Sequence, residues 1–263
     1  MRVAVVTGAG SGIGEAVAHR LLADGWRVVA VDSDPAGLEK FARDGQESNI
    51  RTVLGDVANR HTHKQARAEA ASLGVIHAWI SVAGITRTHA LHDLDEESAR
   101  EVIEVNQLGT LWGAAEAVEA LRESRAGGVI VQISSVHASH AAVGYPVYEM
   151  TKAAADALTR SIAVTYGPLG IRSVSIAPGA IRTPALTAAL EAAPDPAGAT
   201  IQLEGASPLG RIGEPSEIAA AVAFAISDEA SFLSGTSIVV DGGWSAVLLR
   251  DNEVPGSGGG SRD

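Results

Sequence analysis

The chain has 263 residues, of which 31 are acidic and 20 are basic, and its formal net charge of −11 would repel nucleic acid. It contains no cysteine, which excludes disulfides, thiol nucleophiles and thiolate metal sites and fits a reducing compartment. The longest apolar run, residues 218–226, is far shorter than the ~20 residues of a membrane-spanning helix. Because the first apolar run is needed as a strand rather than as a signal peptide, we expect a cytoplasmic protein without a membrane partner.

Apolar strands alternate with helical patterns along the chain, which is typical of a parallel sheet covered by helices on both faces. The expected strands lie near residues 3–6, 27–31, 51–55, 76–82, 128–134, 171–176 and 237–241. We predict one α/β domain over residues 1–250, with a doubly wound parallel sheet of about seven strands and no internal repeat. Residues 251–263 have the composition of a linker, so we expect a flexible tail without function.

The first strand ends in a glycine-rich turn that leads into an amphipathic helix, with the sequence Thr7-Gly8-Ala9-Gly10-Ser11-Gly12-Ile13-Gly14. Glycines at such a turn let the backbone approach a pyrophosphate, and the helix N-terminus supplies unpaired N–H donors and a partial positive charge. The spacing is G-x-x-x-G-x-G rather than G-x-G-x-x-G. The turn predicts a site for an anionic dinucleotide, and a tight turn without a ligand is the alternative.

Asp32 closes the second strand, where a carboxylate can accept hydrogen bonds from the adenosine ribose and would repel a 2′-phosphate. Asp34 and Pro35 already provide the cap and first residue of the next helix, which leaves Asp32 available. Position 11 is serine rather than a basic residue, so no local cation would neutralise an extra phosphate. The expected cofactor is therefore NAD rather than NADP.

Tyr148 and Lys152 are four residues apart and share one face of a predicted helix. A neighbouring cation favours the phenolate, so we expect Lys152 to lower the pKa of Tyr148 from its ordinary ~10. The other two tyrosines, Tyr145 and Tyr166, have no lysine at this spacing. The pair predicts a proton-transfer site, and a half-buried ring beside a solvated amine is the alternative.

From Arg2 to about Trp244, the chain resembles the short-chain dehydrogenase/reductase family, with its single-domain Rossmann fold. The likeness rests on ordered motifs: the T-G-x-x-x-G-x-G turn, Ala83-Gly84 at the end of the family's N-N-A-G segment, and the terminal-strand signature Asp241-Gly242-Gly243. Ser81 and Val82 stand where the family usually has two asparagines. Because the family's asparagine braces the central sheet, this departure puts the local bracing in doubt.

The resemblance implies a catalytic tetrad of Asn106, Ser135, Tyr148 and Lys152. Tyr148 would exchange the substrate proton, Ser135 would hydrogen-bond the substrate oxygen, and Lys152 would also bind the nicotinamide ribose. Asn106 would hold a water that links Lys152 to solvent, although a plain surface asparagine is the alternative. Ser135 precedes Tyr148 by the family's usual thirteen residues, which favours it over Ser134. The expected cofactor-binding residues are Gly8, Ser11, Gly12, Ile13, Gly14, Asp32, Asp56, Val57, Ala83, Gly84, Tyr148, Lys152, Pro178, Gly179, Ile181 and Thr183.

Residues 184–213 resemble the family's mobile lid, and apolar residues such as Leu186 could close over an apolar or alicyclic substrate. His137 and Tyr145 could contact the substrate together with Ser135, or they could lie on a loop surface. We predict an NAD-dependent oxidoreductase that interconverts a secondary alcohol and its ketone. The alternatives are an NADPH-dependent ketoacyl-type reductase and a non-catalytic regulator that senses NAD.

Two histidine pairs, His61 with His63 and His89 with His92, have spacings that a metal could use. Since no acidic or sulfur partners gather around them in the sequence, we predict solvated surface histidines and no metal site. The resemblance also implies that the long helices containing Asn106 and Tyr148 pair with other copies, giving a homodimer or homotetramer.

Overall fold

The computed structural model describes residues 2–44 and 48–248, so the predicted tail, residues 251–263, lies outside the described residues. Seven parallel strands form one sheet in the order β3-β2-β1-β4-β5-β6-β7. Their bounds are β1 Val3–Thr7, β2 Arg27–Asp32, β3 Ile50–Leu54, β4 Ile76–Ser81, β5 Gly128–Ile133, β6 Ile171–Pro178 and β7 Thr236–Val240. The predicted doubly wound α/β fold is confirmed.

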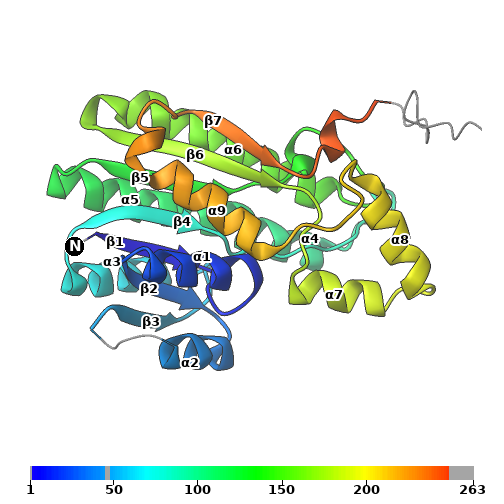
Figure 1. The fold of residues 1–263 in the computed structure, drawn as a ribbon, viewed down its shortest axis with the longest axis horizontal. Helices are drawn as coiled ribbons and strands as arrows, with labels where there is room; N and C mark the ends of the chain where they lie inside the picture. Colours follow the sequence, from blue (N-terminus) through cyan, green and yellow to red (C-terminus); the bar gives the residue numbers. More distant parts are fainter. Residues whose placement is uncertain (1, 45–47, 249–263) are drawn as a thin grey trace, which may run out of the picture.

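Helices cover both faces of this sheet. The α-helices are α1 Gly12–Ala23, α2 Pro35–Arg43, α3 Arg60–Leu73, α4 Glu96–Val102, α5 Gly109–Ser124, α6 Pro146–Tyr166, α7 Pro184–Glu191, α8 Pro196–Ala206 and α9 Pro215–Ile226. Buried side chains of α1, α2 and α9 share one core, and those of α3, α5 and α6 share the other. In Figure 1, α1 and α9 cross the near face, while α7 and α8 lie beyond one end of the sheet.

The central strand β1 shows why this layering follows from the sequence. Successive side chains of a strand point to opposite faces, so Ala4 and Val6 enter one core while Val3 and Val5 enter the other. All five residues of β1 are buried, which explains its unbroken apolar sequence. The chain leaves β1 for β2 on one side and returns to β4 on the other. The crevice at the carboxyl ends of β1 and β4 is where doubly wound folds bind ligands.

A π-helical segment, Ile103–Leu108, joins α4 to α5. The expected helix around Asn106 is therefore present, but it contains a wider turn at this residue. The Asn106 side chain is only 3% exposed, so the alternative of a surface asparagine is wrong. Such π-helical turns occur frequently at functional sites.

Thr7 of β1 holds the end of β4, the segment that the family usually braces with an asparagine. Its Oγ1 accepts hydrogen bonds from the backbone N–H groups of Val82, at 3.1 Å, and Ala83, at 3.3 Å. The ends of β1 and β4 are thus joined by a hydroxyl of β1. The Ser81 hydroxyl, although buried, has no hydrogen-bond partner among the described residues.

The prediction of surface histidines is wrong for His63 and His89, which are 1% and 7% exposed. Each ring is held by a hydrogen bond inside the fold: His63 Nε2 lies 2.8 Å from the Val57 carbonyl, and His89 Nε2 lies 3.0 Å from Ser98 Oγ. Within residues 2–44 and 48–248, no three histidine or acidic side chains group in a way that could hold a metal ion. The same residues contain no helix long and apolar enough to cross a membrane.

Candidate active site

The glycine turn after β1 lies against two other predicted cofactor segments. Gly8 and Gly12 have φ angles of 67° and 56°, which side chains rarely adopt. A Cβ on Gly8 would lie 2.8 Å from the Ala83 Cα, and one on Gly12 would lie 3.1 Å from the Thr183 Cγ2. Ser11 is the N-cap of α1, and its exposed side chain makes no capping hydrogen bond. The turn therefore forms a cradle of close backbone with a free hydroxyl and a helix N-terminus, which fits a dinucleotide pyrophosphate.

Asp32 does not cap α2, but its carboxylate is engaged by backbone donors, and its contact with the ribose stays a prediction. Its Oδ2 accepts a hydrogen bond from Gly10 N at 2.7 Å, and its Oδ1 accepts one from Asp34 N at 2.9 Å. The carboxylate can accept both hydrogen bonds because β2 ends beside the glycine turn. Asp34 caps α2 as predicted, accepting from the N–H groups of Ala36 and Gly37. Each oxygen of Asp32 still has capacity for a further donor, such as a ribose hydroxyl.

Asp56 and Val57, two of the predicted cofactor-binding residues, follow β3, and Val57 packs against the start of α5. A Cβ on Gly109 would lie 3.0 Å from Val57 Cγ2. The Asp56 side chain is exposed and accepts a hydrogen bond from Ala58 N at 2.8 Å, whereas Val57 is 7% exposed. Asp56 and Val57 thus present one polar and one apolar side chain just beyond the end of β3.

The segment from Pro178 to Thr183 is held on both sides. Gly179 N donates to the Val240 carbonyl at 3.0 Å, and Gly213 N donates to the Ala180 carbonyl at 2.9 Å. Thr183 caps α7, where its hydroxyl accepts from Leu186 N at 3.2 Å. These bonds fix a segment that contains four of the predicted cofactor-binding residues.

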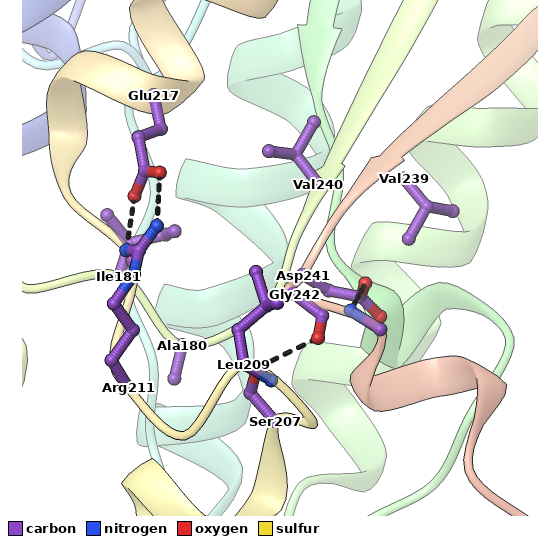
Figure 2. Close-up of a pocket in the computed structure, with 12 residues that line it drawn as sticks. Ala180, Ile181, Ser207, Leu209, Arg211, Glu217, Val239, Val240, Asp241 and Gly242 are labelled. Carbon is purple, nitrogen blue, oxygen red and sulfur yellow. Dashed lines mark hydrogen bonds and ion pairs between the residues drawn. The ribbon is translucent and has the colours of Figure 1, made fainter.

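A cavity of about 290 Å³ lies behind this segment, between the end of β7 and residues 207–213. Figure 2 shows Arg211 and Glu217 facing each other at its edge, with nitrogen–oxygen distances of 2.7 and 2.8 Å. The hydrogen bonds from Arg211 hold the pKa of Glu217 at about 2. Ile181 is the only predicted cofactor residue in the lining, and Tyr148 and Lys152 are not part of it. The cavity is therefore separate from the proton-transfer pair.

Tyr148 and Lys152 lie together on α6, with the lysine Nζ 5.5 Å from the centre of the tyrosine ring. Lys152 is 7% exposed, and its Nζ donates to the Ile133 carbonyl at 2.8 Å. Burial lowers the pKa of Lys152 to about 8, and the nearby Asp156 carboxylate offsets part of this effect. The amine thus retains its charge at neutral pH.

The expected lowering of the Tyr148 pKa is wrong for this structure, in which burial raises it. Hydrogen bonds from the Ser135 and Thr86 hydroxyls act in the opposite direction but do not overcome burial. The Lys152 amine contacts the ring face and bonds to a backbone carbonyl instead of pairing with the phenol oxygen. Tyr148 is accordingly a phenol, able to donate a proton, at neutral pH.

The structure places Ser135, rather than Ser134, beside the Tyr148 hydroxyl. The Ser134 hydroxyl points toward α6 and lies 3.2 Å from the Lys152 carbonyl. Ser135 is the N-cap of the short 3₁₀ segment Val136–Ala138, and its Oγ accepts from His137 N at 3.2 Å.

Asn106 holds the chain that follows Ala83-Gly84. Its Oδ1 accepts from Ile85 N and its Nδ2 donates to the Ile85 carbonyl, both at 2.8 Å. A Cβ on Gly84 would lie 3.2 Å from Asn106 Oδ1 and 3.5 Å from Lys152 Nζ. Asn106 and Lys152 thus both approach Gly84, while the tetrad and the water-holding role of Asn106 stay predictions.

An aromatic group surrounds Tyr148 at the expected substrate side. The His137 ring centre lies 5.5 Å from that of Tyr145, 5.7 Å from that of Tyr148 and 6.4 Å from that of Trp244. The His137 Nδ1 lies 3.5 Å from Glu149 Oε1. His137 and Tyr145 therefore pack against the proton-transfer pair instead of lying on a free loop surface.

Trp244 and Thr86 were not predicted as site residues. Trp244 follows directly after the Asp241-Gly242-Gly243 signature, and Asp241 turns the chain by accepting hydrogen bonds from Gly243 N and Ser245 N. That capping pattern is readable in the sequence, but the contact with His137 depends on the tertiary fold. Leu186 lies on α7, and in the fully described helices α7 and α8 no side chain is buried.

Fold and site together are those of a doubly wound α/β protein with a glycine turn that fits a dinucleotide and a buried tyrosine–lysine pair. A family model described as enoyl-(acyl carrier protein) reductase matches residues 8–245. The chain belongs to the short-chain dehydrogenase/reductase family, whose dehydrogenases act on CH–OH groups with a nicotinamide cofactor.

Three similar proteins illustrate the range of this family. Cis-4-hydroxycyclohexanecarboxylate dehydrogenase of Sinomonas cyclohexanicum is 39% identical over 254 residues, covering 94% of this chain and 97% of that protein. Galactitol 2-dehydrogenase (L-tagatose-forming) of Cereibacter sphaeroides is 33% identical over 245 residues, covering 92% of this chain and 94% of that protein. The ligand-free structure of Thermoplasma acidophilum aldohexose dehydrogenase has a TM-score of 0.86 and 32% identity, covering 96% of this chain and 97% of that one.

Proposed function

We propose that the protein is an NAD-dependent dehydrogenase that interconverts a secondary alcohol and its ketone. The observation that carries this proposal is the Tyr148 phenol beside the Ser135 hydroxyl, with the charged Lys152 amine 5.5 Å from the ring centre. The Lys152 amine lies beside Gly84, and the glycine turn approaches the neighbouring Ala83, which supports a dinucleotide bound next to these groups.

The chemistry follows from what these side chains can do to one C–O bond. When bound, NAD supplies the acceptor for the hydride that leaves the alcohol carbon. In reduction, the Tyr148 phenol gives its proton to the ketone oxygen as general acid, and in oxidation the deprotonated form of the same residue takes the hydroxyl proton as general base. Ser135 donates a hydrogen bond to the substrate oxygen where charge develops. Lys152 binds ribose hydroxyls with the donors that the Ile133 carbonyl leaves available, while Asn106 holds a water on the path to solvent.

Asp32 and Ser11 support NAD over NADP. The Asp32 carboxylate is fixed beside the glycine turn and would repel a 2′-phosphate, and position 11 offers no cation. This counts against an NADPH-dependent ketoacyl-type reductase. A regulator that only senses NAD would not need Tyr148, Lys152 and Ser135 assembled together.

The aromatic group beside Tyr148 supports an apolar or alicyclic substrate. His137, Tyr145 and Trp244 offer ring faces and edges for a saturated ring, and Leu186 adds an apolar side chain from the predicted lid. The Sinomonas relative, a cis-4-hydroxycyclohexanecarboxylate dehydrogenase by name, supports a cyclic alcohol.

We also propose that the protein forms a homodimer or homotetramer through α5 and α6. Leu111, Met150 and Val164 on these helices are 39%, 61% and 81% exposed, and apolar residues of this kind would be covered by a second copy. The molar mass in solution, measured by light scattering, tests this proposal.

Turnover of cyclic and acyclic secondary alcohols with NAD and with NADP tests the function, using Tyr148→Phe as the decisive variant. We expect this variant to lose kcat by roughly 10²–10⁴-fold, because it removes the proton acceptor. Its NAD affinity should remain that of the wild type, and Tyr166→Phe, near the other end of α6, is the matched control. Wild-type turnover in Tyr148→Phe would remove this residue from the mechanism, and NAD binding without turnover of any alcohol would favour the sensor.

A further inference from the structure

Three buried polar atoms from two elements converge on Gly113 of α5. Trp79 Nε1, His63 Nδ1 and Ser81 Oγ lie 2.9, 3.3 and 3.3 Å from the point where a Cβ on Gly113 would stand. Their residues are 0%, 1% and 6% exposed. Within the part of the chain that the structure describes, none of the three atoms has a hydrogen-bond partner. Buried polar groups rarely remain unpaired, so three at one place indicate a common partner.

The hydrogen-bonding character of these atoms defines that partner. His63 Nε2 lies 2.8 Å from the Val57 carbonyl, which can only accept, so Nε2 carries the proton and Nδ1 is an acceptor. Burial lowers the pKa of His63, against weaker opposing effects of Glu116 and Asp56, and so favours this neutral ring. Trp79 Nε1 can only donate. The partner must accept from Trp79 and donate to His63, which a water molecule does and a simple cation or anion does not.

We propose that one buried water molecule bridges Trp79, His63 and Ser81 beside Gly113 and thereby positions the loop at Val57. The water donates to His63 Nδ1, and the opposite nitrogen of the ring holds the Val57 carbonyl. The preceding carbonyl, that of Asp56, accepts the Thr62 hydroxyl at 2.7 Å. Consecutive residues of α3 thus hold both carbonyls of the loop. The role of that loop in binding the cofactor rests on the proposed function, whereas the water itself does not.

A crystal structure at a resolution that shows ordered water tests the site directly. We expect one density peak within hydrogen-bond distance of all three atoms. Three atoms with no density between them, or rings turned so that they bond one another, would overturn the proposal.

The direction in which Ser81→Ala changes the Tm, relative to the wild type, gives a second test. If water fills the site, the variant loses one hydrogen bond and its Tm falls by about 2–4 °C. If the site is dry, the variant removes an unpaired buried hydroxyl and its Tm stays the same or rises, which contradicts the proposal. Ser72→Ala is the matched control, because its hydroxyl bonds the Glu69 carbonyl on the exposed side of α3.

Gly113→Ala tests the positioning role, because its methyl group would crowd the three polar atoms and leave no room for a water between them. We expect the Kd for NAD to rise about fivefold through the loosened Val57 carbonyl, with kcat within about twofold of wild type. Gly167→Ala, where a Cβ meets open space, should leave the Kd unchanged. An unchanged Kd in Gly113→Ala would refute the positioning role. Absence of turnover in the wild type would refute only the proposed function, since density and Tm judge the water independently.

Discussion

Replacing the buried amine of Lys152 should change how the stability of the protein depends on pH. The substitution Lys152→Met keeps a long side chain of similar shape and removes the titrating group. In the wild type, the amine is 7% exposed, and burial lowers its pKa from 10.5 to about 8. An unfolded chain would restore the ordinary value.

The direction in which the stability changes with pH follows from proton binding by the folded and unfolded chains. Between about pH 8 and 10.5, the unfolded chain holds a proton on this amine that the folded protein has released, so the stability contributed by Lys152 rises with pH. At ~1.4 kcal/mol for each pH unit, the full rise is about 3 kcal/mol, and it is absent below about pH 8. Lys152→Met should lack this rise.

Urea unfolding of both proteins at a series of pH values measures the effect. The free energy of unfolding of the wild type, minus that of Lys152→Met, should be constant up to about pH 8 and increase above it. Taking the difference cancels the other titrating groups, and Lys64→Met, at an exposed position of α3, controls for the loss of a lysine. Parallel curves for wild type and Lys152→Met across this range would refute the burial argument.

Two further substitutions test the cofactor and substrate assignments. Asp32→Asn should raise the value of kcat/KM with NADP, relative to that with NAD, about tenfold. Removing the carboxylate charge relieves ~1 kcal/mol or more of its repulsion with a 2′-phosphate at 4 Å. An unchanged ratio in steady-state assays would show that other residues discriminate between the two cofactors. Trp244→Ala should raise KM for cyclic alcohols about tenfold by removing an apolar surface near His137, with KM for NAD unchanged. Trp112→Ala, which removes a ring stacked on Arg60, is the control, and equal effects of the two variants on KM would contradict a substrate contact.

The strands were predictable because central strands of a parallel sheet are buried on both faces and read as apolar runs. β1 is the clearest case, since all five of its residues are buried. The glycine turn was predictable for a related reason: only glycine tolerates the positive φ of Gly8 and Gly12 and the close approach of Ala83 and Thr183. Local sequence determines both features, and so the sequence reveals them.

The electrostatics of the tyrosine–lysine pair could not be read in the same way. Spacing places Tyr148 and Lys152 on one helix face, but the direction of the amine is set by the Ile133 carbonyl, which comes from β5. The pKa of Tyr148 is set mainly by burial, which depends on everything packed around it. Asp32 illustrates the same limit, because the turn that engages its carboxylate is distant in sequence but adjacent in the fold.

The departure at Ser81 and Val82 shows how tertiary partners redistribute a role. An asparagine would supply a donor and an acceptor from one side chain. Here the Thr7 hydroxyl accepts the neighbouring backbone N–H groups instead, and the shorter Ser81 leaves its hydroxyl facing Trp79 and His63. The ends of β1 and β4 therefore stay joined, while a second polar group forms around Ser81, and only the burial of His63 and the absence of a side chain at Gly113 make that group possible. Where this chain departs from its family, the physical consequence lies in the neighbours of the changed residue as much as in the residue itself.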